Sequence, residues 1–84
     1  MHPMKVRLLF FAVLRDITGQ NELELTLAEG TRAGEVWQTL RERHRELAAY
    51  ARPPLTAINE SYASADSILR DGDELAFIPP VAGG

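Results

Sequence analysis

The stretch over residues 71–84 constrains this chain more than any other, and it reads DGDELAFIPPVAGG. Its Asp-Gly step is typical of a tight turn, and the short apolar run over residues 75–78 predicts a final strand. Pairing must then stop, because Pro79 and Pro80 have no backbone N–H to give to a neighbouring strand. The sequence therefore predicts a chain that leaves its sheet in an extended, stiffened form.

Beyond the prolines the side chains shrink, from Val81 through Ala82 to Gly83 and Gly84. A six-residue extended tail reaches about 20 Å from the body, at about 3.3 Å per residue. Glycine also lets another protein approach the backbone closely, since it has no Cβ. We therefore predict a single domain over residues 1–78 and an extended tail over residues 79–84 that fits a narrow tunnel. The alternative is a frayed terminus, which is common at chain ends.

Two alternating stretches near the start predict a pair of strands. Over residues 5–13 the even positions are apolar and predict a core face, whereas Leu9 and Phe11 fall on the other face. A strand buried on both faces is the alternative, because fully covered strands also have continuous apolar runs. Leucines alternate with polar residues over 22–27, which predicts a hairpin partner for the first strand.

The middle of the chain predicts a helix over residues 33–48, with its apolar side chains in one stripe roughly 120° wide and Thr31 as N-cap. His44 lies in that stripe and is interpreted as a packing residue. A short strand over residues 55–59, a very short one near Tyr62 and a helical turn over residues 64–69 are expected before the final strand. This order predicts an α+β fold, with four to five strands and one crossover helix on one face of the sheet.

Size and composition exclude several classes of function. A chain of 84 residues supports one modest core but not a deep catalytic cleft beside it. A net charge of −3 argues against a nucleic-acid partner, and the absence of cysteine excludes thiolate metal sites and disulfides. No run approaches the ~20 apolar residues of a membrane span. The apolar run over residues 8–14 is short for a signal peptide, and no cleavage site follows it. We therefore expect a soluble, cytoplasmic protein with no membrane partner.

No catalytic or metal-binding pattern can be assembled from this sequence. It has no cysteine nucleophile, no glycine-rich phosphate loop, no histidine–carboxylate pair at a spacing that indicates a catalytic site, and no cluster of metal ligands. Asp71, Asp73 and Glu74 are interpreted as turn residues. We therefore expect no active site of its own and no metal, and function through a partner.

Two segments carry a family resemblance. DGDELAFIPPVAGG at residues 71–84 resembles the C-terminal signature of the molybdopterin synthase small subunit, a ubiquitin-like sulfur-carrier family. VRLLFFAVLR at residues 6–15 resembles the first strand of the same family, so the similarity spans the chain. Ala82 departs from the threonine often seen in that family, and Ile78 from a phenylalanine, but both stay within the required shape class: Ala82 is small, and Ile78 is large and apolar.

The resemblance implies a β-grasp fold with a mixed sheet, in which the last strand lies parallel to the first. One face of the sheet then stays uncovered. We expect Phe11, Tyr62 and Ile78 to cluster there as a docking patch for a larger subunit, with Leu9 and Val81 at its margins. Scattered surface apolar residues are the alternative.

The resemblance also implies a chemistry for the tail. A partner enzyme uses ATP to adenylate Gly84, and a sulfur donor then displaces AMP to leave a thiocarboxylate, that is, a covalent 1-thioglycine. The tail, residues 79–84, enters the large subunit of molybdopterin synthase and passes sulfur to cyclic pyranopterin monophosphate. The chain is then the sulfur-donating subunit of a sulfurtransferase complex in molybdenum cofactor biosynthesis, with no bound cofactor of its own.

Three alternatives remain open on the sequence. A sulfur carrier for thiamine thiazole synthesis shares the chemistry but has a different acceptor. The molybdopterin branch is favoured by Phe10-Phe11-Ala12 and by Ile78-Pro79-Pro80-Val81. A ubiquitin-like protein modifier shares the adenylation step, although Lys5 is the only lysine and leaves little scope for chains of self-conjugates. A plain interaction domain involves no covalent chemistry.

Overall fold

The computed structural model describes residues 3–11, 13–49 and 54–78. Its elements follow the order strand, helix, strand, helix, 3₁₀ helix and three strands. They are β1 (Met4–Phe10), α1 (Val13–Thr18), β2 (Glu22–Leu27), α2 (Ala33–Arg43), η1 (Arg45–Ala49), β3 (Leu55–Ile58), β4 (Ser61–Ala63) and β5 (Glu74–Ile78).

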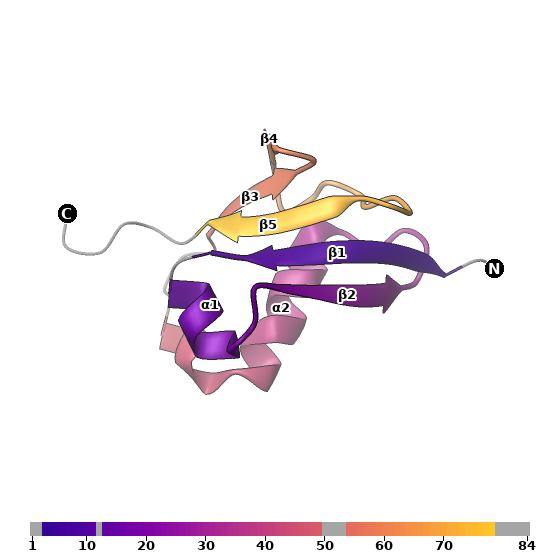
Figure 1. The fold of residues 1–84 in the computed structure, drawn as a ribbon. Helices are drawn as coiled ribbons and strands as arrows, with labels where there is room; N and C mark the ends of the chain where they lie inside the picture. Colours follow the sequence, from indigo (N-terminus) through magenta and orange to yellow (C-terminus); the bar gives the residue numbers. More distant parts are fainter. Residues whose placement is uncertain (1–2, 12, 50–53, 79–84) are drawn as a thin grey trace.

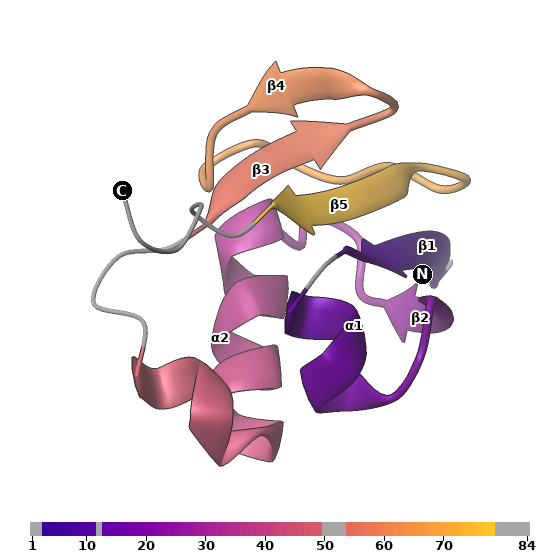
Figure 2. The same cartoon turned by 60° about the vertical axis from the view of Figure 1, so that its left-hand side comes forward.

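The five strands form one mixed sheet in the order β2-β1-β5-β3-β4. β5 runs parallel to β1, with Leu8 opposite Leu75, and antiparallel to β3. Both α-helices lie on the same face of the sheet (Figure 1, Figure 2). The predicted parallel pairing of the last strand with the first is thus confirmed, and the opposite face carries no helix among the described residues.

The core lies between the sheet and α2. Alternate residues of β1 and β5 point inward, because successive side chains of a strand face opposite ways. They meet the apolar stripe of α2, where the rings of Trp37 and Phe77 pack edge to face at a centroid distance of 5.2 Å. The largest fully buried side chains are those of Phe77, Leu8, Leu14, Leu47, Leu69, Leu75 and Val6.

Phe77→Ala tests this arrangement of the core. Phe77 is fully buried and contacts Trp37, so the substitution removes apolar contacts and leaves a cavity. We expect a loss of about 3–5 kcal/mol in the free energy of unfolding, measured by urea denaturation. Tyr62→Ala is the control, because Tyr62 is 78% exposed and its truncation should change that free energy by less than about 0.5 kcal/mol. A loss below about 1 kcal/mol for Phe77→Ala would contradict the packing described.

The first strand is shorter than predicted. β1 ends at Phe10, and α1 follows, so the prediction of a strand to residue 13 is wrong. The helical turn buries Leu14 fully and packs Ile17 against the core, which a continued strand would not do. Gly19 ends α1 with φ 73°, and its N–H donates to the Arg15 carbonyl at 2.8 Å, as is typical of a glycine C-cap.

The predicted helix over residues 33–48 is also too long. α2 ends at Arg43, because His44 has an extended backbone (φ −126°, ψ 106°), and η1 follows. Leu47 is nevertheless fully buried, so the apolar stripe continues into the 3₁₀ helix. His44 is half-buried, and among the described residues no group of three or more His, Cys, Asp or Glu side chains could hold a metal ion.

The start of α2 is capped by a loop rather than by a side chain. Thr31 is not the N-cap: Arg32 is, and the Thr31 hydroxyl donates to the Ala28 carbonyl. The N–H of Gly34 instead donates to the Ala65 carbonyl at 2.8 Å. Ala65 belongs to residues 64–69, for which a helical turn was predicted, but this segment forms turns without a helix. A Cβ at position 34 would lie 3.0 Å from the Ala65 Cβ, which explains a glycine in the first turn of a helix.

Candidate functional site

One row of side chains crosses the outer face of the sheet, the face opposite α2. The strand registers place Leu9 of β1 beside Ala76 of β5, Ala76 beside Ala57 of β3, and Ala57 beside Tyr62 of β4. The two central members of this row are alanines, and the outer members are large. The row is therefore low in the middle and high at its ends.

This difference in side-chain size creates a hollow of about 290 Å³, which we call the outer hollow. Phe11 and Tyr62 are large apolar side chains that remain 46% and 78% exposed, whereas Leu9 and Ile78 are half-buried. The residues that line the hollow are Leu9, Phe11, Ala57, Glu60, Tyr62, Glu74, Ala76 and Ile78. An exposed apolar depression with polar residues at its margin is typical of a protein-binding surface.

All four residues predicted for the partner interface, Leu9, Phe11, Tyr62 and Ile78, line the outer hollow. Sequence reasoning missed the floor, which is formed by Ala57 and Ala76. Strand alternation places Ala76 on the same face as Ile78, so a signal for it existed, but the significance of a small residue depends on its larger neighbours. Val81, predicted at the margin, lies outside the described residues.

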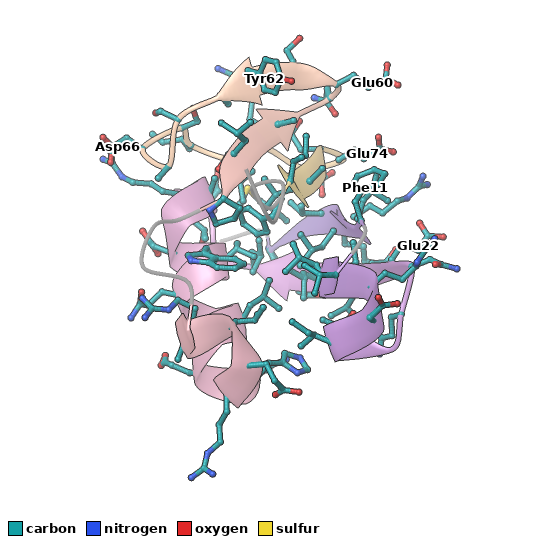
Figure 3. All side chains as sticks on the ribbon, turned by 90° about the vertical axis from the view of Figure 1, so that its left-hand side faces the viewer. Phe11, Glu22, Glu60, Tyr62, Asp66 and Glu74 are labelled. Atoms are coloured by element: carbon teal, nitrogen blue, oxygen red, sulfur yellow. The ribbon has the colours of Figure 1, made fainter. Side chains whose placement is uncertain are left out.

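Acidic side chains border the outer hollow. Glu60 and Glu74 line it, and Figure 3 shows Phe11, Glu74 and Glu60 following one another along one side of the sheet. Arg7 lies between two of the nearby acids, with its Nη1 3.4 Å from Glu74 Oε2 and its Nε 3.4 Å from Glu22 Oε2. These exposed ion pairs contribute little to stability, so their charges remain available to a partner.

The turn between β3 and β4 positions Glu60. Asn59 and Glu60 both have positive φ angles, 52° and 71°, as in the tight hairpin turns that match strand twist. The Asn59 side chain ties this turn to β5: its Nδ2 donates to Asp73 Oδ1 at 2.9 Å, and its Oδ1 accepts from the Glu74 N–H at 3.0 Å. Asp73 thus holds the neighbouring turn in place, whereas Glu74 is the first residue of β5 and not the turn residue that was predicted.

The outer hollow adjoins the point where the described chain ends. Ile78 is the last residue of β5, pairs with Leu55 of β3 and lines the hollow. The residues predicted to form the tail, Pro79, Pro80, Val81, Ala82, Gly83 and Gly84, lie outside the described residues. A partner that covered the outer hollow would therefore also cover the place from which residue 79 continues. No helix in the described part of the chain is long and apolar enough to cross a membrane.

Comparison with known proteins identifies the family. The sequence model of the ThiS family matches residues 8–84. The chain belongs to the ThiS family. One relative of this chain is the "Molybdopterin synthase sulfur carrier subunit" of Aedes aegypti, which is 40% identical to it over 96% of this chain and 90% of the relative. The resemblance to the small sulfur-carrier subunit of molybdopterin synthase is thus confirmed.

Two solved structures place the ThiS family chain among ubiquitin-like β-grasp proteins. The putative molybdopterin converting factor, subunit 1, from Pyrococcus furiosus superposes with a TM-score of 0.80 at 30% identity, over 93% of this chain and 99% of the other. Small archaeal modifier protein 1 from Methanosarcina acetivorans gives 0.78 at 24% identity over the whole of both chains, a likeness that shows the fold alone. The predicted β-grasp fold is confirmed.

Proposed function

We propose that this chain is the sulfur-carrier small subunit of molybdopterin synthase and that it acts in the cytoplasm, where ATP is available for its activation. Three observations support the proposal: the family match, a relative with this name, and the position of the outer hollow beside the start of the tail. The position of the outer hollow is the structural observation on which the proposal mainly depends. Ile78 lines the hollow that we propose as the docking surface, and the segment that ends in Gly83 and Gly84 follows Ile78 in the sequence.

The chemistry takes place at the carboxyl carbon of Gly84. An ionised carboxylate is a poor electrophile, so an adenylating partner first joins it to AMP from ATP and releases pyrophosphate. A sulfur donor equivalent to hydrosulfide then attacks the carbonyl carbon, and a C–S bond forms as the C–O bond to AMP breaks. The resulting thiocarboxylate is an anionic sulfur nucleophile suited to attack cyclic pyranopterin monophosphate.

The body of the domain positions this reagent. The outer hollow accepts apolar side chains of the large subunit, and docking there holds the tail at a high effective concentration in the partner's active site. Pro79 and Pro80 restrict the tail before it binds, which lowers the entropy lost on threading. The large subunit supplies the acceptor site, and this chain supplies the sulfur.

Intact mass spectrometry tests the proposal. After incubation with ATP, an adenylating enzyme and a sulfur donor, we expect the chain to gain about 16 Da, the difference between oxygen and sulfur at one carboxyl group. Omission of ATP should prevent the gain. Conjugates joined to other proteins would instead indicate a protein modifier, and an unchanged mass would indicate an interaction domain without covalent chemistry.

A further inference from the structure

Strand β2 forms one edge of the sheet and pairs only with β1 among the described strands. The N–H of Phe10 donates to the carbonyl of Asn21 at 2.9 Å, just before β2 begins. Hydrogen-bonded pairs alternate along an antiparallel ladder, so the backbone groups of Glu22, Glu24 and Thr26 point away from β1. This edge therefore presents unused donors and acceptors to which another strand can bind.

An apolar hollow of about 120 Å³ lies beside this edge, between β2 and α2, and we call it the edge groove. Three half-buried leucines of β2 form one wall, and α2 forms the other. The residues that line it are Leu23, Leu25, Thr26, Leu27, Val36, Thr39, Leu40 and Arg43. A strand added to β2 would place every second side chain over this groove.

Charge defines the kind of strand that fits. The outward face of β2 carries Glu22 and Glu24; Glu22 is paired with Arg7, whereas Glu24 has no ion pair with any described residue. Of the described residues that line the edge groove, only Arg43 is charged. Cationic side chains are thus favoured on the outward positions of an added strand and disfavoured on its inward positions, where apolar side chains fit.

A second copy of this chain is a poor occupant of the edge. Pairing β2 with β2 would bring the glutamates of both copies onto one face of a joined sheet, and nearby like charges destabilise such pairing. Edge strands that carry charged side chains in this way resist self-association. The same glutamates would attract a basic strand.

We propose that the β2 edge and the edge groove bind a short extended segment of another protein, in which apolar residues alternate with lysine or arginine. Main-chain hydrogen bonds to Glu22, Glu24 and Thr26 hold the segment, and the groove selects its apolar side chains. The edge groove lies on the helix side of the sheet, and β1 separates the β2 edge from β5 and β3, whose alanines form the floor of the outer hollow. Both surfaces can therefore be occupied at once, and the proposal does not rest on the function proposed above.

NMR titration of the full-length, ¹⁵N-labelled chain tests the proposal. The probe is a capped heptapeptide of alternating valine and lysine, and its matched control alternates valine and glutamate. We expect amide shifts over residues 22–27 and 36–43 with the lysine peptide, and at least about tenfold weaker binding of the glutamate peptide. Equal binding of both peptides, no binding, or shifts centred on Leu9 and Ala76 would overturn the proposal.

Two substitutions separate charge from strand pairing. Glu24→Lys changes an exposed side chain and should reverse the preference between the two peptides. Thr26→Pro removes an outward N–H without breaking the ladder to β1, and should weaken binding of the lysine peptide at least about tenfold relative to Thr26→Val, which keeps that donor. An unchanged preference for Glu24→Lys would overturn the proposal, as would β2 amide signals that broaden with protein concentration in the absence of peptide.

Discussion

Deletion of Gly84 is expected to lower sulfur transfer to cyclic pyranopterin monophosphate by at least about 1,000-fold, because reacting groups displaced by even 1 Å lose about 100-fold in rate. Removing one residue shortens an extended tail by about 3.3 Å, so the new terminal carboxyl group no longer reaches the acceptor. The measurement is dithiolene product formed per unit time in a reconstituted reaction with the large subunit, quantified by mass spectrometry. The same assay separates the molybdopterin branch from the thiazole branch, since only the former yields this product.

Two controls accompany the deletion. Gly84→Ala keeps the length of the tail and adds one methyl group, so it should retain more activity than the deletion. Addition of one glycine after Gly84 should impair transfer about as strongly as the deletion, because it displaces the carboxyl group by the same distance in the other direction. Full activity of the shortened chain would contradict the proposal that sulfur transfer depends on the carboxyl group of Gly84 at the end of a tail of fixed length.

Ala76→Arg is expected to weaken binding to the large subunit at least about 100-fold, which corresponds to about 2.7 kcal/mol. Ala76 forms the floor of the outer hollow beside Ala57, and an arginine there would fill the space that a partner side chain needs. Glu74, which also lines the hollow, would hold the guanidinium in place. Isothermal titration calorimetry with the purified large subunit gives the dissociation constant.

Ala48→Arg is the matched control for this substitution. Ala48 lies in the exposed part of η1 on the helix side of the molecule, so the same change of residue should leave the affinity within about twofold of the original. The urea midpoints of both variants show whether the fold is intact. Equal affinities for the two variants would mean that the partner docks elsewhere.

Much of the fold follows from strand periodicity. The alternation in residues 5–10 assigns Val6, Leu8 and Phe10 to the core, and all three are buried. The same alternation assigns Leu9 to the other face, where the final strand brings Ile78 close to it. These predictions succeed because a two-residue period fixes the side of the sheet on which a residue lies.

The parts that sequence reasoning missed depend on contacts between distant segments. The strand was predicted to continue to residue 13, the first residue of α1, because apolar residues follow directly on those of β1, and no helix was predicted there. Leu14 turns inward only once α2 and the sheet provide a core for it. The start of α2 depends on the loop at Ala65, which is far away in sequence. The floor of the outer hollow requires two alanines on different strands to become neighbours.

The strand synthesised last among those described occupies the middle of the sheet, between β1 and β3. A polypeptide truncated before Glu74 would therefore lack the strand that joins the two halves of the sheet, and its apolar residues would stay exposed. Incomplete products of translation would accordingly be recognised by chaperones and proteases. Assembly of the complete sheet therefore requires that translation has passed β5, the strand that joins β1 to β3.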